Sequence, residues 1–342
     1  MQHEITSSIP LLGRNGELTE PGYARKPLWN YRRRDIKAGK TRIKEWDYYL
    51  VMNDRFALAL TVADNSYMGL DSISFLDFTE GWEITKSPMS FLPMGKTGLP
   101  SASLSGDTQS HGRGHGILFK NDGGGTRRLI AHMNNFGSGA IYANIELTDE
   151  PEESIVIATP FEKPGHFYYN QKINCMRAKG EVTYAGKTYV FDPSDSFAVL
   201  DWGRGVWTYR NTWYWGSASG LANGVPFGWN IGYGFGDTSA ATENMLFYGG
   251  KAHKLEHVRF NIPKKNGRDD FMSPWTFTSS DGRFNMDFTP VLDRASCTDI
   301  GIIKSDQHQV FGKFTGTAVL DNGEAIKVSD FMGFAEKVEN KW

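Results

Sequence analysis

The sequence predicts an all-β protein. It contains 38 glycines, 10 tryptophans, 14 tyrosines and 22 phenylalanines in 342 residues, and glycine-punctuated aromatic and β-branched segments favour strands over helices. These segments are short and recur between turn pairs along almost the whole chain. The chain is also longer than the ~250–300 residues at which a single core stops growing, so two domains or one double-sized β architecture are expected.

The expected strands follow in order along the chain. Turn pairs such as Asn53-Asp54 and Asp122-Gly123 separate them, and Ala185-Gly186 in "GEVTYAGKTYVFDP" predicts a hairpin. Short helical pieces are expected only near residues 237–244 and in "GRDDFM", and neither is long enough to organise a domain. The predicted strands are 46–52, 55–63, 67–78, 115–119, 127–134, 139–147, 154–161, a pair within 180–193, 206–219, 226–236, 244–248, 254–262, 274–278, 283–288, 300–304, 308–320 and 324–331.

The strand series divides the chain into three parts. Residues 1–45 mix turn residues with basic residues and show little periodicity, so we expect an N-terminal arm on the surface. A similar series of strands starts again after about residue 200, which suggests a first β domain at 46–200 and a second at 201–342. Many short strands at this spacing indicate sandwiches or barrels.

The stretch "FGWNIGYGFG" has an unusual alternation. Every second residue from Phe227 to Phe235 is large and apolar, whereas the opposite face of the strand carries glycines and Asn230. Glycine weakens a strand by about 0.5–1 kcal/mol relative to alanine, so something bulky is expected against the bare face. Either a ligand or an inserted aromatic side chain of the protein itself would fit.

Composition excludes several classes of protein. Lys plus Arg (37) nearly balance Asp plus Glu (39), so no overall field favours nucleic acid. The two cysteines form no disulfide framework and no zinc spacing, and no signal peptide or membrane-spanning run is evident. The prediction is a cytoplasmic protein with no cofactor and no metal.

Several segments resemble a known family. "LTEPGYARKPLWNYRRRDIK", "RIKEWDYYLV", "DWGRGVWTYRNTWYWGSASG", "GYGFGDTSAATENMLFYGG" and "SDQHQVFGKF" are similar to the bacterial family called domain of unknown function 2804, from about residue 10 to the C-terminus. More distantly, "GEVTYAGKTYVFDPSDSFAVLDWGRGVW" resembles a segment of carotenoid 1,2-hydratases, whose superfamily also includes AttH-like proteins and pericyclases. This resemblance implies two tandem lipocalin-like antiparallel β-barrels.

The hydratase resemblance is partial. Leu200-Asp201 is followed here directly by "WGRG", whereas the hydratases place His or Glu between the Asp and the Trp-Gly. The resemblance therefore implies the fold and a pocket near Asp201, and it does not carry over the hydratase reaction.

Four residues are candidates for acid–base chemistry: Asp201, Asp237, Glu243 and His308. A carboxylic acid beside aromatic rings can be kept protonated by desolvation, which suits a general acid. His308 lies two residues after Asp306, so the two side chains share one strand face about 7 Å apart at Cα. The alternatives are structural: Asp237 capping a short helical turn, Glu243 in a salt bridge, and His308 as a satisfied histidine.

The candidate ligand-binding residues surround a tryptophan-rich strand. An apolar wall with a few polar groups is the usual composition of a small-molecule site, although an aromatic β core has the same composition. The candidates are Arg204, Trp207, Tyr209, Arg210, Asn211, Trp213, Trp215, Trp229, Asn230 and Tyr233.

Three functions therefore remain open from the sequence. The first is an enzyme that protonates an apolar, unsaturated small molecule (isoprenoid, polyene or acyl-type) for hydration, cyclisation or isomerisation. The second is a binding protein for the same ligands without catalysis, and the third is a glycan-related role in an open groove. In addition, the basic cluster at 32–44 contacts anionic lipid at a membrane surface, is a solvated arm, or is paired with the protein's own carboxylates.

Overall fold

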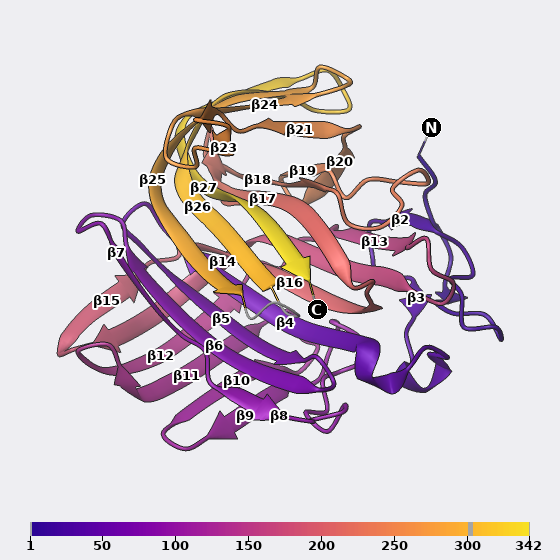
Figure 1. Cartoon of the computed structure of the whole chain (residues 1–342). Helices are drawn as coiled ribbons and strands as arrows, with labels where there is room; N and C mark the ends of the chain where they lie inside the picture. Colours follow the sequence, from indigo (N-terminus) through magenta and orange to yellow (C-terminus); the bar gives the residue numbers. More distant parts are fainter. Residues whose placement is uncertain (1, 300–303, 342) are drawn as a thin grey trace.

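The computed structural model describes residues 2–299 and 304–341. It confirms an all-β fold of large, curled antiparallel sheets (Figure 1). The described residues contain no α-helix, only the 3₁₀ turns η1 (Arg33–Asp35) and η2 (Lys40–Arg42). No helix in these ranges has the length and apolarity needed to cross a bilayer.

The two predicted helical pieces are wrong. Residues 237–244 form an irregular extended segment, and the Asp-rich region contains a hairpin of β22 (Lys264–Lys265) and β23 (Arg268–Asp269). Segments this short do not sustain a helix without tertiary support. The strand predicted at 300–304 lies almost entirely outside the described residues.

The larger sheet has 14 strands and contains most of the first 206 residues. Its main order is β7-β6-β5-β4-β16-β14-β12-β11-β10-β9, with β13 and β15 on β14, β2 on β13, and β8 on β6. Strand β9 approaches β5 and β7 approaches β11, so the sheet curls toward closure. The strands are β2 (Gly22–Ala24), β4 (Ile43–Met52), β5 (Phe56–Asp64), β6 (Met68–Asp77), β7 (Trp82–Lys86), β8 (Met89–Phe91), β9 (Thr108–Gly112), β10 (His115–Asn121), β11 (Arg127–Phe136), β12 (Gly139–Thr148), β13 (Ile155–Pro160), β14 (Phe167–Tyr184), β15 (Lys187–Phe191) and β16 (Phe197–Val206).

The smaller sheet has nine strands in the order β20-β19-β18-β17-β27-β26-β25-β24-β21. Three of them, β25, β26 and β27, are long and run beside the larger sheet (Figure 1). The strands are β17 (Arg210–Ala222), β18 (Val225–Tyr233), β19 (Met245–Tyr248), β20 (Lys251–Lys254), β21 (Val258–Asn261), β24 (Trp275–Ser279), β25 (Phe284–Asp299), β26 (Lys304–Val319) and β27 (Ala325–Lys341).

The change from one sheet to the other falls between β16 and β17. The predicted boundary at residues 200/201 lies inside β16, which pairs with β4 and β14 over its whole length. We place the boundary of the proposed two-domain division after Val206, since the described strands from there on belong to the smaller sheet or to the separate β22–β23 hairpin.

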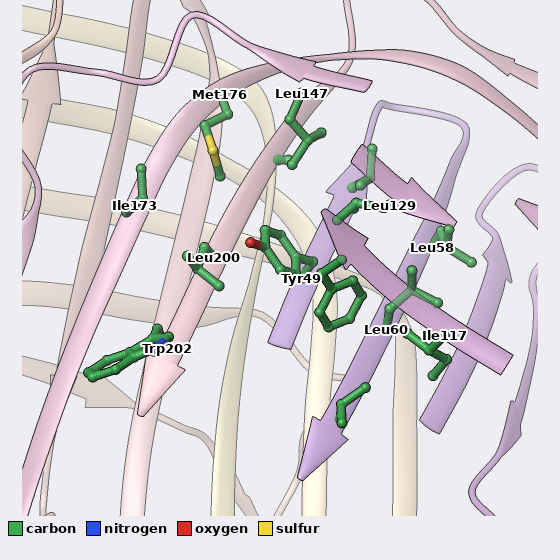
Figure 2. Close-up of a cluster of buried hydrophobic side chains, with 14 of the residues drawn as sticks. Tyr49, Leu58, Leu60, Ile117, Leu129, Leu147, Ile173, Met176, Leu200 and Trp202 are labelled. Carbon is green, nitrogen blue, oxygen red and sulfur yellow. The ribbon is translucent and has the colours of Figure 1, made fainter. Parts of the chain in front are cut away.

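Each sheet encloses its own apolar core. Figure 2 shows part of the core of the larger sheet, where side chains from β4, β5, β10, β11, β14 and β16 converge. Tyr49 packs edge-on against Phe119 with ring centroids 4.7 Å apart. In the smaller sheet, Trp229 is fully buried against Phe284 and Phe314. The two interiors are filled by side chains, so any large cavity must lie elsewhere.

The N-terminal arm is less superficial than predicted. Strand β1 (Ile9–Pro10) pairs with β3 (Trp29–Asn30), and β2 joins the larger sheet through β13. Leu11, Trp29 and Tyr31 are buried in the core of that sheet. Burial of these apolar side chains stabilises the packing of the arm on the sheet.

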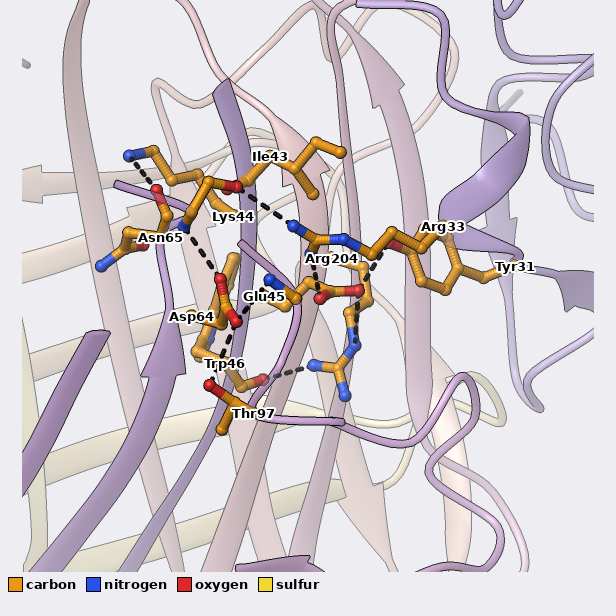
Figure 3. A network of polar contacts seen from close by, with 12 residues as sticks. Tyr31, Arg33, Ile43, Lys44, Glu45, Trp46, Asp64, Asn65, Thr97 and Arg204 are labelled. Atoms are coloured by element: carbon orange, nitrogen blue, oxygen red, sulfur yellow. Dashed lines mark hydrogen bonds and ion pairs between the residues drawn. The ribbon is translucent and has the colours of Figure 1, made fainter. Parts of the chain in front are cut away.

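Part of the basic cluster at 32–44 is paired inside the protein (Figure 3). Arg33 bonds to Glu45, and Lys44 is fully buried with its ammonium 4.2 Å from the centroid of the Tyr67 ring. Arg42 donates to the carbonyl oxygen of Trp207 at 3.1 Å. Arg33 therefore pairs with a carboxylate of the protein, whereas Lys44 and Arg42 contact an aromatic ring and a carbonyl oxygen of the protein.

The glycine-bearing face of the stretch "FGWNIGYGFG" is covered by other parts of the protein. A Cβ at Gly228 would lie 2.8 Å from Sγ of Cys175, and one at Gly232 would lie 2.6 Å from Oε1 of Glu243. A Cβ at Gly234 would meet the carbonyl oxygen of Thr212 at 2.8 Å. The glycines therefore permit close approach of β14, β17 and the Glu243 carboxyl. At these three positions the nearest atoms of the described residues belong to backbone, Cys175 or Glu243 and not to an inserted aromatic ring.

Candidate functional site

The candidate site is a cavity of about 550 Å³ between the two sheets. Strands β4, β5, β6, β7, β14 and β16 of the larger sheet form one side, and β17, β25, β26 and β27 of the smaller sheet form the other. The segment after β18 contributes Phe235 and Glu243. The principal lining residues are Trp46, Tyr48, Tyr168, Lys172, Asp201, Trp207, Trp213, Trp215, Phe235, Glu243, Arg294, Gln309 and Glu336.

Lys172 is the central cation of the cavity. Its side chain on β14 is only 4% exposed, and its ammonium lies 2.9 Å from Oδ1 of Asp201 and 4.0 Å from Oε2 of Glu243. It also lies 4.4 Å from the centroid of the Trp215 ring. A buried ammonium requires such partners, because desolvation of an unpaired charge is costly.

Asp201 is held in place from its own sheet. Nδ2 of Asn170 donates to Oδ1 of Asp201 at 2.6 Å, in addition to the ion pair with Lys172. Because β14 and β16 are antiparallel neighbours in which Lys172 lies opposite Asp201, the pair is fixed by strand register.

Glu243 approaches the same ammonium from the segment between β18 and β19. Burial raises the pKa of its carboxyl, while Lys172 and the amide of Asn230 act in the opposite direction. Nδ2 of Asn230 donates to both the backbone oxygen and Oε2 of Glu243, at 2.9 and 3.2 Å. The Oδ1 atom of the same amide accepts from Nε1 of Trp215 at 2.7 Å, so Asn230 links the aromatic wall to the acid.

Glu336, on β27, is the most perturbed acid of the cavity. Burial raises its pKa from 4.5 to about 7, although hydrogen bonding from Trp213 and the charge of Arg294 oppose the shift. Nε1 of Trp213 donates to Oε1 of Glu336 at 2.9 Å, and Nε2 of Gln309 donates to Oε2 at 3.0 Å. A carboxyl with this pKa exchanges protons readily near neutral pH, which suits a general acid or base.

Aromatic rings form an apolar wall of the cavity. Phe235 packs edge-on against Tyr168 and Trp207, with centroids 4.8 Å apart in both pairs. Trp207 in turn packs against Trp46 at 5.2 Å, and Trp213 packs against Phe235 at 5.2 Å. Such edge-to-face packing makes a rigid apolar surface whose ring faces attract positive charge.

The structure brings five of the sequence-predicted residues together at this cavity. Asp201, Glu243, Trp207, Trp213 and Trp215 line it, and Asn230 supports Glu243 from behind. These residues come from two sheets, and they meet because β16 and β17 lie on opposite sides of the same cavity.

Asp237 lies outside the cavity. Its exposed carboxylate accepts a hydrogen bond from the backbone N–H of Ser239 at 2.9 Å, and hydrogen bonding with Ser239 lowers its pKa. The structure therefore corrects the expectation of a protonated acid here in favour of the turn-capping alternative.

Four of the other ligand-binding candidates have different surroundings. Arg204 is fully buried and donates to the carbonyl oxygen of Trp46 at 2.7 Å (Figure 3). It also donates to the carbonyl oxygen of Pro100 at 2.7 Å and to Asp47 at 3.0 Å. Trp229 belongs to the core of the smaller sheet. Tyr209 and Arg210 are exposed at the start of β17.

Asn211 is also away from the cavity. Its amide bonds to the hydroxyl and the carbonyl oxygen of Thr208, at 2.9 and 2.8 Å, and so closes the turn before β17. The strand alternation predicted from Trp207 to Trp215 therefore does not hold before β17, because regular pairing with β27 starts only at Arg210.

His308 and Tyr233 line a separate surface groove of about 870 Å³ on the smaller sheet. Nδ1 of His308 lies 2.7 Å from Oδ2 of Asp293, closer than Asp306, whose Oδ1 lies 3.7 Å from Nε2. The hydrogen bond with Asp293 raises the pKa of His308, and Phe271 stacks on its ring at 3.9 Å. His308 is therefore a partnered histidine outside the cavity of Lys172.

The groove and the cavity lie on opposite faces of the same strands, because successive side chains of a strand point to opposite sides. Trp213 and Trp215 on β17, Glu336 on β27 and Gln309 on β26 point into the cavity. Their chain neighbours Tyr214, Lys337 and His308 line the groove. These three strands form one wall with two functional faces, as the alternation of strand side chains requires.

Sequence reasoning missed Lys172 and Glu336, the two most informative charges of the site. Each is an ionisable residue inside a largely buried strand segment, "YYNQKINCM" for Lys172 and "MGFAEKVEN" for Glu336. Lys172 is the only charge in its segment, which is a signal for a buried polar site because charges are rarely buried without a partner. Glu336 gives no such signal, since Lys337 and Glu339 follow it in the same segment. Trp46, Tyr48, Tyr168, Arg294 and Gln309 were also missed.

Comparisons with known proteins agree with this fold. The model of the family described as domain of unknown function (DUF2804) matches residues 2–342. No curated protein is significantly similar in sequence. Three solved structures are similar: an AttH-like protein from Nitrosomonas europaea (12% identity, 86% of this chain and 92% of that one, TM-score 0.51), kievitone hydratase from Nectria haematococca (11%, 98% and 96%, TM-score 0.50) and CghA (12%, 100% and 97%, TM-score 0.52).

Proposed function

The chain belongs to the DUF2804 family, whose name assigns no activity, and we propose that it is an acid–base enzyme acting on an unsaturated small molecule with an apolar body. The single observation that carries this proposal is the carboxyl of Glu336, which faces the cavity between the sheets with a pKa of about 7. A carboxyl with this pKa is protonated in part near neutral pH, as a proton donor working at that pH requires.

The proposed ligand follows from the two kinds of wall. The rings of Trp207, Trp213 and Phe235 would contact the apolar part of the molecule. The charges of Lys172 and Arg294 would bind its polar end, such as a carbonyl or hydroxyl oxygen. The substrate class is therefore amphipathic rather than purely hydrocarbon.

The proposed reaction begins with proton transfer from Glu336 to a carbon of a double bond. The resulting positive charge would be stabilised by the surrounding ring faces and by the Glu336 carboxylate left behind. In a hydration, water would then add to the cation and lose a proton to Glu243 or Asp201. In an isomerisation or cyclisation, the cation would instead lose a proton or be captured by an internal group.

Glu243 and Asp201 are suited to the second role because they share Lys172. The ammonium lies 2.9 Å from Oδ1 of Asp201 and 4.0 Å from Oε2 of Glu243, and it favours the charged form of Glu243 against the effect of burial. In this proposal one of these two carboxylates accepts a proton while Glu336 donates one. Two acids with different environments in one cavity are the usual arrangement for paired acid–base work.

A binding protein without catalysis is the second candidate. It is favoured by the rigid aromatic wall, which binds ligands whether or not a proton moves. One structural neighbour is named a hydratase, but a likeness at 11% identity concerns the fold alone. The cytoplasm stays the predicted location, on the basis of the two cysteines without disulfide spacing.

Deuterium incorporation distinguishes the two candidates. Protein purified from its host would be examined by native mass spectrometry for a bound ligand, and that ligand would then be incubated with fresh protein in D₂O. An enzyme incorporates deuterium at carbon, and Glu336→Gln abolishes incorporation while retaining the ligand. Incorporation that is absent, or unchanged in Glu336→Gln, would contradict the proposed role of Glu336. As a matched control, Glu339→Gln changes a carboxyl on the same strand that faces the groove.

A further inference from the structure

An exposed apolar tip borders the cavity on the larger sheet. It consists of Met89, Phe91 and Leu92, which are 61%, 86% and 61% exposed. Large apolar side chains clustered at such exposure are unusual on a soluble surface and mark interaction sites. This apolar tip belongs to β8 and the residue after it.

The apolar tip lies next to residues that line the cavity. Met89 pairs with Leu70 across the β6–β8 ladder, and Leu70 lines the cavity. Ser87, two residues before Met89, also lines it and bonds to Ser72 at 2.9 Å between hydroxyl oxygens. Ser87 lies in the short link between β7 and β8, whereas Met89 and Phe91 share one face of β8 because alternate strand residues point to the same side. The cross-strand pair of Met89 with Leu70 therefore connects this face of β8 to the lining of the cavity.

The backbone holds the apolar tip firmly. The N–H of Leu92 donates to the carbonyl oxygen of Tyr67 at 3.0 Å, and the N–H of Met94 donates to that of Ser66 at 3.0 Å. The N–H of Gly95 donates to Oδ2 of Asp64 at 2.8 Å. The exposed side chains are therefore presented on an anchored segment rather than on a loose loop.

Basic residues lie near the apolar tip, both in the chain and in the neighbouring basic segment. Lys86 and Lys96 flank it in the chain, and both are exposed. The side chain of Arg33 lies against Gly95, which brings the basic segment beside the tip. The side chain of the neighbouring Arg34 is 78% exposed, and its Nε lies 4.0 Å from Oδ1 of Asp35. Exposed apolar side chains with Lys and Arg nearby in the chain suit an interface between acyl chains and anionic head groups.

We propose that Met89, Phe91 and Leu92 dock the protein on an anionic lipid surface, with the flanking cations contacting the head groups. The charge around the tip and its continuity with the cavity favour lipid over a second copy of the chain, which would have to accommodate like charges. This inference goes beyond the proposed function: it supplies a route by which an apolar molecule dissolved in a membrane would enter the cavity without crossing water.

Vesicle sedimentation tests the proposal. The full-length protein would be mixed with phosphatidylcholine vesicles with and without phosphatidylglycerol. We expect binding to the anionic vesicles and a loss of at least about tenfold in affinity for Phe91→Ser/Leu92→Ser, since two large side chains no longer enter the lipid. Val190→Ser, which alters an equally exposed apolar side chain on β15 (57% exposed), should change affinity less than about twofold.

The charge contribution is tested separately. Lys86→Gln/Lys96→Gln should weaken binding to the anionic vesicles by at least about tenfold, at ~1 kcal/mol per charge, and leave binding to phosphatidylcholine unchanged. The proposal is overturned if the wild type does not bind anionic vesicles, or if the apolar variant binds as well as the wild type. It is also overturned if the apolar variant instead abolishes a dimer seen by analytical ultracentrifugation.

Failure of this inference is distinguishable from failure of the proposed function. Vesicle binding requires no ligand, and deuterium incorporation can be measured with detergent-dissolved ligand in the absence of vesicles. Loss of the first result leaves the cavity chemistry intact, and loss of the second leaves the docking surface intact.

Discussion

The carboxyl of Glu243 lies directly against the backbone of Gly232. A Cβ at Gly232 would be 2.6 Å from Oε1 and 3.0 Å from Cδ of Glu243, closer than real Cβ contacts allow. The N–H of Gly232 donates to Oδ1 of Asn244 at 2.7 Å, which fixes the segment that carries the acid. The glycine on β18 therefore creates the space in which Glu243 reaches Lys172.

Gly232→Ala should displace Glu243 and destabilise the fold. The new methyl group would also meet the carbonyl oxygen of Tyr214 at 2.8 Å, so part of the clash is with backbone. We expect a loss of about 1–3 kcal/mol in the free energy of unfolding, as for overpacked cores. Urea denaturation measures it. Gly39→Ala is the control, because a Cβ there meets nothing within 4 Å; equal losses in the two variants would refute the contact.

Glu336 should make stability depend on pH in a defined direction. Its pKa is raised in the folded protein from 4.5 to about 7, so the folded state binds the proton more tightly than the unfolded state. This contribution to stability is complete below pH 4.5 and is lost as pH rises to about 7. The loss is of the order of 3 kcal/mol at 1.36 kcal/mol per pKa unit.

Glu336→Gln isolates that contribution from other titrating groups. The free energy of unfolding of the wild type minus that of the variant should fall between pH 4.5 and 7, and level off above. Denaturant unfolding of both proteins across this range provides the measurement. A difference that is constant with pH would show that Glu336 titrates normally.

Lys172→Met should destabilise the protein strongly by leaving Asp201 without its ion pair. Asp201 is only 9% exposed, and the amide of Asn170 would remain its closest partner. Breaking one side of a buried pair costs about 3–5 kcal/mol. Chemical denaturation of Lys172→Met, Asp201→Asn and the double variant forms a double-mutant cycle. The double variant should recover part of the loss, whereas purely additive effects would contradict the pairing.

The two thiols should differ in reactivity. Cys175 is buried, and burial raises its pKa to about 12, whereas Cys297 is exposed. Reaction requires an accessible thiolate, so a disulfide reagent at pH 8 should modify one thiol in the folded protein and two after unfolding. Cys297→Ser should abolish the reaction of the folded protein. Rapid labelling of folded Cys297→Ser would show that β14 opens at Cys175.

Much of the fold followed from sequence patterns, because strand side chains alternate with a period of two. Most predicted strands match observed ones, and the turn at Ala185-Gly186 has positive φ at both residues, of 48° and 83°. The segments 167–179 and 197–206 were missed as strands. They are buried over nearly their whole length, so apolar and polar side chains do not alternate clearly there.

The sequence by itself determined which side chains share a strand face, as it did for Trp213 with Trp215 and for Asp306 with His308. Only the tertiary structure decided which face meets the other sheet. The packing of β17, β26 and β27 against β4, β14 and β16 turned Glu336 toward Lys172, from which it is 164 positions distant, and turned His308 away. Local alternation is a property of the backbone, whereas the pKa of Glu336 depends on burial between two sheets that no short stretch of sequence contains.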